Sequence, residues 1–351
     1  MSGTSLDGLD IAHVSFDFSR SENIEFQLIN CKTYPLPTGI FTQLSSVFNL
    51  SATAVFQLDQ ELAVFYAACI DAFIEEFELK REQITAIASH GQTIFHQPTN
   101  GFTTQIGCGS TLNYLTKIPV IDQFRQLDVS AGGQGAPLVP IGDQLLFSKI
   151  ADGFLNLGGF ANISTVQNKK SLAYDICPAN LPMNRWVQEI GLNYDPDGSH
   201  ARQGQVLPEV VAKALELEFF GQNAPKSLGT EWLESVYLPL FEQYKLTDKL
   251  RTHLEIIKIL CNREFQNLGL KSVYLTGGGA LNSYLIELLR QAFDGEVILP
   301  DSKLINYKEA LIFAFLGARF LRKESTTLSE VTGAKEALRT GILHDFQGRI
   351  G

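Results

Sequence analysis

The sequence predicts an α/β protein with two domains, and three observations lead to that fold class. Segments with strand-like spacing alternate with segments with helix-like spacing along the chain, which is the pattern of mixed α/β architectures. The chain has 351 residues, more than one hydrophobic core usually supports. Gly-rich turns follow or flank strands in both halves, a distribution that fits a ligand held between two related domains.

The first half of the chain opens with a hairpin and a long helix. Residues 11–18 and 25–33 have the pattern of two strands joined by a polar turn. Apolar side chains at helical spacing predict one long helix over residues 58–77, with one buried face. Residues 84–88 then predict a short strand of the buried type, and the small residues of 130–140 predict a loop.

The second half repeats this alternation. An apolar strand beginning at Phe154 runs into the diglycine Gly158-Gly159, and a strand over residues 272–275 runs into the triglycine at 277–279. The helices expected in this half cover residues 208–220, residues 247–268, a segment from about Ala280, and residues 307–322.

Composition and charge exclude several classes of function. Lys and Arg total 28 against 38 Asp and Glu, which gives a net charge of −10 without any basic block. Nucleic acids and anionic membranes are therefore not expected as partners, because both attract proteins with a positive field. No apolar run reaches the roughly 18 residues that span a bilayer, no export signal is visible, and the cysteines are scattered. We expect a cytoplasmic protein without a disulfide framework or a zinc site.

Three Gly-rich turns, at residues 3–8, 158–162 and 277–279, are candidates for phosphate binding. Glycine allows positive φ and a close approach of the backbone, so successive N–H groups can converge on an anion. Hydroxyls in the first turn would add donors, and Asp7 would hold a Mg²⁺ ion. A single diglycine after a strand is more often an ordinary tight turn, whereas three such turns in both halves fit a clamped nucleotide. None matches the Walker A pattern, which excludes a P-loop kinase.

Several longer segments give these turns a more specific meaning. The first ten residues form one such segment, and residues 132–140 form another. The others are His90-Gly91-Gln92-Thr93 with His96 and Pro98, Asn156 to Ile163, Pro225-Lys226-Ser227, and Lys308-Glu309-Ala310. These segments occur along the chain from residue 1 to about 335 in the order in which the family has them. The chain therefore resembles the anhydro-N-acetylmuramic acid kinases, a family of sugar kinases in the actin-like ATPase superfamily.

The resemblance implies two RNase H-like, actin-like domains that flank a nucleotide cleft. The first would be formed by residues 1–143 plus 306–351, and the second by residues 144–305. It also implies a kinase that uses ATP and Mg²⁺ to phosphorylate O6 of 1,6-anhydro-N-acetylmuramic acid while water opens the anhydro bridge. The product would be N-acetylmuramic acid 6-phosphate, an intermediate of peptidoglycan recycling. A homodimer is implied as well, although the sequence itself shows no interface.

The same resemblance assigns roles to individual residues. Asp175 falls at the catalytic aspartate, where a carboxylate would act as general base toward the attacking water. Gln92, Arg125 and Glu309 would contact the sugar or its lactyl carboxylate, which a guanidinium suits geometrically. Asp7 is the expected metal ligand. The residues expected to bind the nucleotide are Gly3, Thr4, Ser5, Leu6, Asp7, Gly8, Leu9, Asp10, Gly158, Gly159, Asn162, Gly277, Gly278, Gly279 and Asn282.

Each of these assignments has a structural alternative. Asp175 could cap a helix that starts near Asn180, and Arg125 could form a surface ion pair. Glu309 could be an acid in the first turn of a helix, which the helix dipole favours. Two rival functions also fit the sequence. One is a kinase for another amino sugar or hexose, and the other is a non-catalytic nucleotide-binding protein of the same fold.

Two of the chain's departures from the family pattern bear on the predicted site and on the first sheet. Cys177 and Ala179 stand where the family usually has glycine, so the loop near Asp175 loses access to positive φ and the exact sugar stays open. The family also has a short apolar strand before the first phosphate loop, in the middle of the first sheet, whereas this sequence starts inside the loop. Without that strand, backbone groups inside the sheet would go unpaired. We therefore expect the natural protein to begin several residues upstream.

Overall fold

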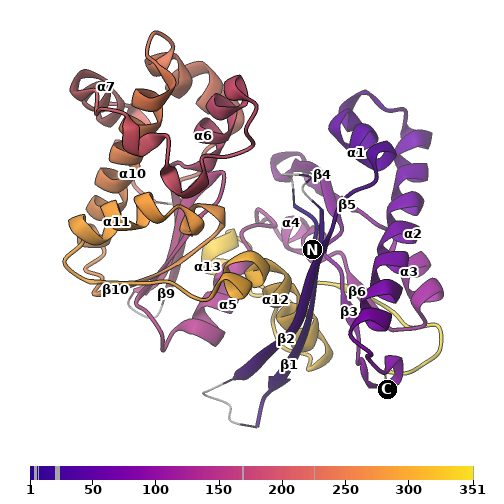
Figure 1. Ribbon diagram of the computed structural model, residues 1–351. Helices are drawn as coiled ribbons and strands as arrows, with labels where there is room; N and C mark the ends of the chain where they lie inside the picture. The colour runs from indigo at the N-terminus through magenta and orange to yellow at the C-terminus, as the bar shows by residue number, and fades with distance from the viewer. Residues whose placement is uncertain (4–5, 7, 20–23, 168–169, 225, 351) are drawn as a thin grey trace. The chain divides into compact units, whose positions relative to one another are not determined.

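The computed structural model describes residues 1–351 other than 4–5, 7, 20–23, 168–169, 225 and 351. The chain divides into two compact units (Figure 1). Unit 1 comprises Met1–Leu146 and Tyr307–Gly351, and unit 2 comprises Phe147–Asn306. The sequence prediction places these boundaries at residues 143/144 and 305/306. No helix in the described ranges is long and apolar enough to cross a membrane.

Unit 1 begins with the predicted hairpin. The strands of this unit are β1 (Leu9–Asp17), β2 (Glu25–Tyr34), β3 (Ile87–Ala88), β4 (Gln92–Gln97), β5 (Phe102–Ile106), β6 (Val120–Asp122) and β12 (Ile342–His344). Its helices are α1 (Thr38–Ser45), α2 (Ala52–Glu76), α3 (Gly109–Thr116), α4 (Gln126–Ser130), α5 (Val139–Gly142), most of α12 (Ser302–Leu321) and α13 (Ser329–Thr332). β1 and β2 pair antiparallel from Leu9↔Tyr34 to Asp17↔Glu25, which confirms the hairpin.

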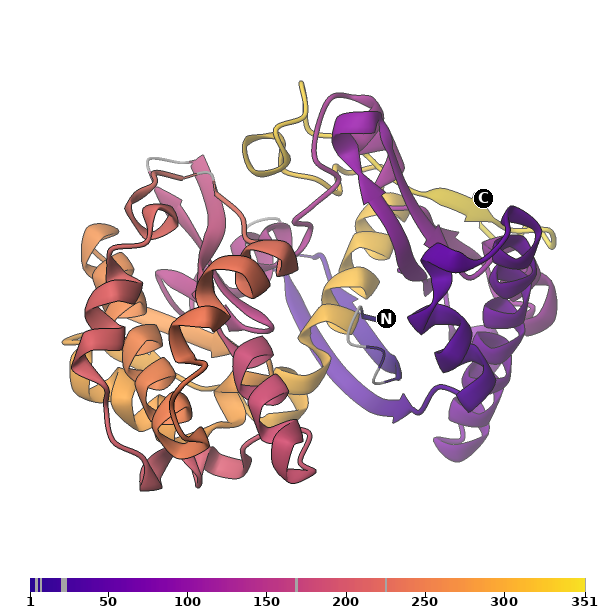
Figure 2. The same cartoon turned by 90° about the horizontal axis from the view of Figure 1, so that it is seen from above.

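The strands of unit 1 form separate small sheets. β1 and β2 make a two-stranded sheet, β4 and β5 make another, and a three-stranded sheet has the order β12-β6-β3. Within the last sheet β3 runs parallel to β6, while β12 runs antiparallel to it. The β1–β2 ribbon lies along α12 (Figure 2), where the rings of Phe16 and Phe315 have centroids 5.5 Å apart.

The long predicted helix is α2, and it starts earlier than its apolar spacing indicates. Ser51 is its N-cap, because the side chain of Ser51 accepts a hydrogen bond from the Ala54 amide at 3.2 Å. Its buried face includes Leu58, Leu62 and Phe73. The helix therefore begins at Ala52, six residues ahead of Leu58, where the apolar stripe in the sequence starts.

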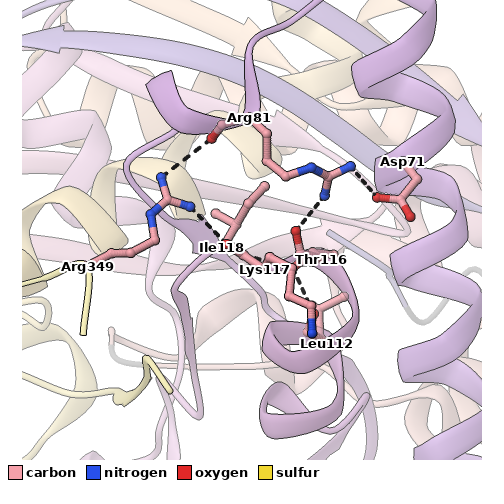
Figure 3. Close-up of polar contacts among 7 residues, drawn as sticks. All are labelled: Asp71, Arg81, Leu112, Thr116, Lys117, Ile118 and Arg349. Carbon is pink, nitrogen blue, oxygen red and sulfur yellow. Dashed lines mark hydrogen bonds and ion pairs between the residues drawn. The ribbon is translucent and has the colours of Figure 1, made fainter. Parts of the chain in front are cut away.

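An arginine near the C-terminus, Arg349, bonds the end of the chain to the rest of unit 1 (Figure 3). The guanidinium of Arg349 donates to the carbonyl of Lys117 at 2.9 Å. It also donates to the carbonyl of Ile84 at 3.1 Å. Arg81 donates to the Thr116 carbonyl and to Asp71 Oδ1, the latter at 2.8 Å. The two guanidiniums thus satisfy the Thr116 and Lys117 carbonyls at the C-terminal end of α3, which have no partner within the helix.

Unit 2 has one five-stranded sheet with the order β11-β10-β7-β8-β9. Its strands are β7 (Gly153–Leu157), β8 (Phe160–Gln167), β9 (Lys170–Pro178), β10 (Ser272–Thr276) and β11 (Glu296–Ile298). Its helices are α6 (Asn180–Val187), α7 (Pro208–Leu215), α8 (Glu218–Gly221), α9 (Thr230–Trp232), α10 (Leu246–Asn267) and α11 (Ser283–Ala292). β7, β8 and β9 are antiparallel neighbours, whereas β10 is parallel to β7 and β11 is parallel to β10. This strand order is that of an RNase H-like domain, as the resemblance implied.

Two helix starts differ from the sequence prediction because of their caps. The helix expected from about Ala280 begins at Ser283, since Asn282 Oδ1 accepts from the Leu285 amide at 3.0 Å and caps α11. The last helix begins at Ser302 rather than at Tyr307. The interpretation of Glu309 as a first-turn acid is therefore wrong, because two turns of α12 precede it.

Candidate functional site

The glycine turns of unit 2 leave from one edge of its sheet. β7 and β10 are parallel neighbours, so the turns that follow their carboxyl ends emerge side by side, where α/β sheets bind ligands. Gly277 has φ +80°, and a Cβ there would lie 2.5 Å from Asn156 Oδ1. A Cβ on Gly279 would lie 2.7 Å from the Cβ of Leu157. Only glycine fits at these two positions without displacing the end of β7.

The diglycine turn is bonded to the start of α6. The carbonyls of Gly158 and Gly159 accept hydrogen bonds from the amides of Asn180 and Ala179, at 3.0 Å and 2.9 Å. The side chain of Asn180 donates to the carbonyl of Leu157 at 2.8 Å. Asn180 also lies against the triglycine, because a Cβ on Gly279 would be 2.9 Å from its Oδ1. Asn180 thus joins both turns.

The sequence prediction missed Asn180 as a site residue. The available signal was its position, a polar side chain at the first turn of a helix that directly follows a strand. That signal predicts a helix start, and only the three-dimensional structure shows that the side chain turns back to the two glycine turns.

Asp175 lies on β9 beside a β-bulge. Asn162 on β8 pairs with Asp175, and the preceding Ala161 pairs with Cys177, so Ile176 is an extra residue in the ladder. Bulges of this kind re-aim side chains and are common next to active sites. The bulge brings two predicted site residues, Asn162 and Asp175, opposite each other on adjacent strands.

The Asp175 carboxylate is held by a neighbouring loop. Its Oδ2 accepts a hydrogen bond from the Leu228 amide at 2.8 Å, and its own amide donates to the Lys226 carbonyl at 3.0 Å. Burial raises the pKa of Asp175, and the Leu228 bond opposes that rise because it favours the ionised form. The helix-cap alternative is wrong, since the N-cap of α6 is Ala179 and no side chain caps that helix.

Asn282 has a structural task that limits how it could bind a nucleotide. It is buried, and its Oδ1 caps α11. A Cβ on Gly198, at φ +67°, would lie 2.6 Å from that same oxygen, so the turn ending at Gly198 packs directly on it. The side-chain NH₂ of Asn282 is therefore the group left to donate to a ligand.

Unit 1 places four polar residues in a connected series of hydrogen bonds. Ser2 Oγ donates to Gln92 Oε1 at 2.5 Å, and His90 Nδ1 lies 3.2 Å from the Ser2 carbonyl. On the other side of the ring, Arg125 Nε donates to His90 Nε2 at 3.1 Å. The imidazole is therefore neutral, with its proton on Nδ1 and its Nε2 accepting. Burial and the Arg125 charge lower the pKa of His90 well below its ordinary value, which agrees with this tautomer.

Arg125 is oriented by its hydrogen bonds to His90 and Gly135. Its Nη1 donates to the Gly135 carbonyl at 2.8 Å, and its Nη2 lies 3.0 Å from His90 Nε2. Because a guanidinium carries five N–H donors, one on Nη1 and one on Nη2 remain for a ligand. Burial lowers the pKa of Arg125 to about 10, and the Glu309 carboxylate opposes that shift. The contacts of Arg125 are thus to an imidazole and a carbonyl, and the surface ion-pair interpretation is wrong.

Comparison with known proteins decides the family. The family model described as "Anhydro-N-acetylmuramic acid kinase" matches residues 1–345. Curated relatives include the "Anhydro-N-acetylmuramic acid kinase" of Vibrio vulnificus (strain YJ016), which is 35% identical and aligns with 98% of this chain and 96% of its own. The protein of the same name from Pseudomonas fluorescens (strain Pf0-1) is also 35% identical, with 98% of each chain covered. The chain belongs to the anhydro-N-acetylmuramic acid kinase family.

Similarity to solved structures is much weaker than this sequence match. A ROK family glucokinase from Streptomyces griseus, in complex with glucose and AMPPNP, aligns with a TM-score of 0.38 at 10% identity. The alignment covers 87% of this chain and 98% of that chain. A likeness of this size carries no argument about the fold or the activity.

The first Gly-rich turn, residues 3–8, is only partly described by the structure. Thr4, Ser5 and Asp7 lie outside the described residues, so the Mg²⁺ site predicted at Asp7 stays a prediction. In the described part of the chain, no three His, Cys, Asp or Glu side chains gather into a metal-binding group. Of the other residues predicted to bind nucleotide in this turn, Leu9 is 5% exposed and belongs to the core. Asp10 Oδ1 accepts a hydrogen bond from Thr33 Oγ1 at 2.6 Å.

The remaining residues of that turn are shaped by the neighbouring strand. The Leu6 amide donates to the Gly3 carbonyl at 3.3 Å, and Leu6 has φ +56°. A Cβ on Gly8 would lie 2.7 Å from the Tyr34 carbonyl oxygen, at the end of β2. Gly8 therefore lets the turn approach β2 closely.

The two positions at which the chain departs from the family's glycines differ in backbone conformation. Cys177 is an ordinary strand residue, paired with Ala161 and fully buried. Ala179 has φ −128° and ψ −97°, which lies outside the α and β regions that residues with a Cβ usually adopt. The prediction that this loop loses access to positive φ rests on the residue types alone, and the described backbone has negative φ at Ala179.

Proposed function

We propose that this protein transfers the γ-phosphoryl group of ATP to O6 of 1,6-anhydro-N-acetylmuramic acid, with Asp175 as the general base. The observation that carries the assignment of the base is the environment of its carboxylate. Oδ2 is occupied by the Leu228 amide, and within the described structure no other hydrogen bond to the carboxylate is found. Oδ1 is then the atom that would accept a proton from water.

The reaction balances with this single base. Water attacks the anomeric carbon, its proton moves to Asp175, and the bond from the anomeric carbon to O6 breaks. The released O6 forms a bond to the γ-phosphorus while the bond between that phosphorus and the ADP oxygen breaks. Partial burial supports the assignment, because a carboxylate whose pKa is raised is a stronger base than a solvated one.

The glycine turns of unit 2 fit a nucleotide. At Gly277 and Gly279 an added Cβ would meet the end of β7, so the backbone there can follow a ligand closely, as phosphate- and adenosine-binding turns require. Mg²⁺, when bound, would neutralise charge that develops on the phosphates. We assign the nucleotide contacts of this unit to Gly158, Gly159, Asn162, Gly277, Gly278, Gly279 and the side-chain NH₂ of Asn282.

Arg125 is the residue of unit 1 that we assign to the lactyl carboxylate of the sugar. The bonds to His90 and Gly135 fix the plane of its guanidinium, and the two remaining N–H groups can form a fork that matches a carboxylate. Gln92 and Glu309 are assigned to the sugar hydroxyls and amide. We further propose that the protein acts in the cytoplasm and as a homodimer, as the family resemblance implies.

The direct test is ADP release from Mg-ATP by the purified protein, with and without 1,6-anhydro-N-acetylmuramic acid. N-acetylmuramic acid and N-acetylglucosamine serve as comparison sugars. Asp175→Asn keeps an acceptor for the Leu228 amide but removes the base, so kcat should fall by about 10²- to 10⁴-fold. Asp294→Asn, an exposed charge removal in the same unit, is the matched control and should leave kcat unchanged.

Arg125 is tested by its effect on binding rather than on chemistry. Arg125→Lys keeps the charge but loses the planar fork, so KM for the anhydro sugar should rise by roughly tenfold or more while KM for ATP stays constant. An unchanged sugar KM would remove Arg125 from the sugar site. Full activity of Asp175→Asn would remove Asp175 as the base.

A further inference from the structure

The Gly-rich loop at residues 131–135 of unit 1 has no part in the function proposed above. It follows α4, and its backbone is bonded on two sides. The Gly133 amide donates to the Asp128 carbonyl in α4 at 2.9 Å. The next amide, that of Gln134, donates to the Thr332 carbonyl in α13 at 2.7 Å. The loop is therefore anchored both to the helix before it and to the C-terminal part of unit 1.

The side chain that this loop surrounds is Asp128, which is fully buried. Its Oδ2 accepts a hydrogen bond from the Gly135 amide, and its Oδ1 accepts one from the Thr332 hydroxyl, each at 2.7 Å. A Cβ on Gly133 would overlap Oδ2, so only glycine lets the loop close over the carboxylate. A carboxylate removed from water needs such donors, and bonds to a carboxylate are stronger than bonds between neutral groups. Asp128 therefore fixes the position of the Gly135 amide.

Gly135 connects this carboxylate to Arg125. The amide of Gly135 is bonded to Asp128, and its carbonyl accepts a hydrogen bond from Arg125 Nη1 at 2.8 Å. The backbone of Gly135 has φ +67°, a conformation that glycine adopts without strain. A shift of the Gly135 amide also shifts its carbonyl, because only the two soft dihedrals of one residue separate these groups.

The direction of the Arg125 guanidinium depends on two contacts. His90 Nε2 holds one edge of it, since it lies 3.1 Å from Nε and 3.0 Å from Nη2. A guanidinium held at that edge alone can still tilt, whereas the bond from Nη1 to the Gly135 carbonyl fixes where the remaining N–H groups point. Bidentate binding of a carboxylate requires a fixed direction of this kind. The fork that we assign to the lactyl carboxylate therefore depends on where Asp128 holds Gly135.

We propose that Asp128 is a positioning residue of the sugar site, which acts through Gly135 on the Arg125 guanidinium. Thr332 completes the arrangement, because its hydroxyl holds the other oxygen of the Asp128 carboxylate. The inference rests on the proposed function, in which Arg125 binds the lactyl carboxylate of the sugar. Asp128 itself contacts neither sugar nor nucleotide, so its loss should act on the binding of the acidic sugar and not on the binding of ATP.

The test compares three variants in the ADP-release assay with 1,6-anhydro-N-acetylmuramic acid. Asp128→Ala removes both bonds, so the KM for the anhydro sugar should rise roughly tenfold or more, while the KM for ATP stays constant. In Asp128→Asn, the amide oxygen can accept from Gly135 and the NH₂ can donate to the Thr332 hydroxyl, which also accepts, so the sugar KM should return most of the way. Thr332→Val keeps the shape but removes one donor, and it should raise the sugar KM by roughly threefold.

Two comparisons separate positioning from general damage to unit 1. Asp345 also bonds two donors in this unit, the amides of Arg349 and Ile350 at 3.0 Å and 2.7 Å, and Asp345→Ala should leave the sugar KM unchanged. In an Arg125→Lys background, Asp128→Ala should add little to the sugar KM, because both changes remove the same contact. Damage unrelated to Arg125 would instead raise the KM by the same factor in both backgrounds.

A measurement without turnover keeps this inference separate from the proposed function. The Nε–H of Arg125, observed by nitrogen NMR, should exchange with solvent roughly threefold faster or more in Asp128→Ala than in the unmodified protein. Equal exchange, an unchanged sugar KM, or an equal KM rise in the Arg125→Lys background overturns the inference. If Asp128→Ala does not fold, Thr332→Val carries the same comparisons. An unmodified protein that releases no ADP with the anhydro sugar refutes the proposed function, and the role of Asp128 at a sugar site falls with it, whatever the exchange rates show.

Discussion

Gly277 offers the sharpest test of how the triglycine turn is built, because Gly278 provides a control one residue away. At Gly277 the backbone has φ +80° and ψ 164°, a region that only glycine occupies readily. An added Cβ would also lie 2.5 Å from Asn156 Oδ1 and 2.7 Å from the carbonyl carbon of Leu157. At Gly278 the nearest atom would be Asn180 Nδ2 at 3.5 Å, which is an ordinary contact.

These geometries predict very different costs for the same chemical change. The backbone conformation alone costs roughly 1–3 kcal/mol for alanine at Gly277, and displacing the end of β7 adds roughly 1–3 kcal/mol. We therefore expect Gly277→Ala to lower the free energy of unfolding of unit 2 by about 2–5 kcal/mol. Gly278→Ala should change it by no more than about 1 kcal/mol, with the sign favourable if the loss of unfolded-state entropy dominates.

Urea unfolding followed by tryptophan fluorescence measures this difference in the right unit. The chain has two tryptophans, Trp186 and Trp232, and both lie in unit 2. Gly277→Ala should also weaken ATP binding, because the turn can relieve the clash only by moving away from β7. Equal unfolding midpoints for the two alanine variants would refute the reasoning, since the packing of Gly277 against β7 would then carry no energy.

Three further predictions concern charge. Lys308 and Asp143 form a buried ion pair with an N···O distance of 2.6 Å, so Lys308→Met should lower the free energy of unfolding by about 3–5 kcal/mol. In chemical denaturation, the double variant that also carries Asp143→Leu should recover part of the lost stability. Burial raises the pKa of Asp175 above its ordinary value of 3.8, and the proposed base must be ionised, so the acid-side fall in kcat should begin at a pH above 3.8. A pH–rate profile that stays flat down to pH 4 would contradict this. Burial lowers the pKa of His253 from 6.5 to about 4, so the unfolded state binds the proton more tightly and stability is lost as pH falls below 6.5. The free energy of unfolding should be roughly 2 kcal/mol lower at pH 5 than at pH 8, and urea titrations of His253→Gln at the two pH values should not show this difference.

Periodicity and cap residues account for what the sequence predicts well. The helical stripe that includes Leu58 and Leu62 predicts α2, and the alternating segments on either side of a polar turn predict the β1–β2 hairpin. In both cases the signal is local, because a helix or hairpin buries one face of its own sequence. The starts of α11 and α12 were placed a few residues off, since a single capping side chain such as Asn282 outweighs the apolar pattern around it.

Contacts between distant segments account for what the sequence prediction missed. The bulge at Ile176 depends on how β9 pairs with β8, and no residue type in β9 predicts it. The bond between Arg125 and His90 joins residues 35 positions apart, and it decides that the guanidinium is a fixed donor rather than a surface ion pair. Likewise, Asn180 became a site residue only when the sheet order brought the two glycine turns together.

Asp175 and the glycine turns of unit 2 belong to one connected set of hydrogen bonds, and this has a consequence for the effect of pH on activity. His253 Nε2 donates to the Ala179 carbonyl at 2.8 Å, while its Nδ1 accepts from the Tyr237 hydroxyl at 2.8 Å. The Ala179 amide in turn donates to the Gly159 carbonyl, and Ala179 lies four residues after Asp175 in the sequence.

Protonation of His253 would place a second donor against the Tyr237 hydroxyl and loosen the start of α6. Acid could therefore reduce activity in two ways, by protonating Asp175 or by releasing Ala179 from the diglycine turn. The two causes separate in the His253→Gln variant, which keeps an amide donor for the Ala179 carbonyl but does not titrate. If its acid limb matches that of the unmodified protein, the loss of activity belongs to Asp175 alone. If the limb moves to lower pH, the start of α6 sets the pH range of the enzyme.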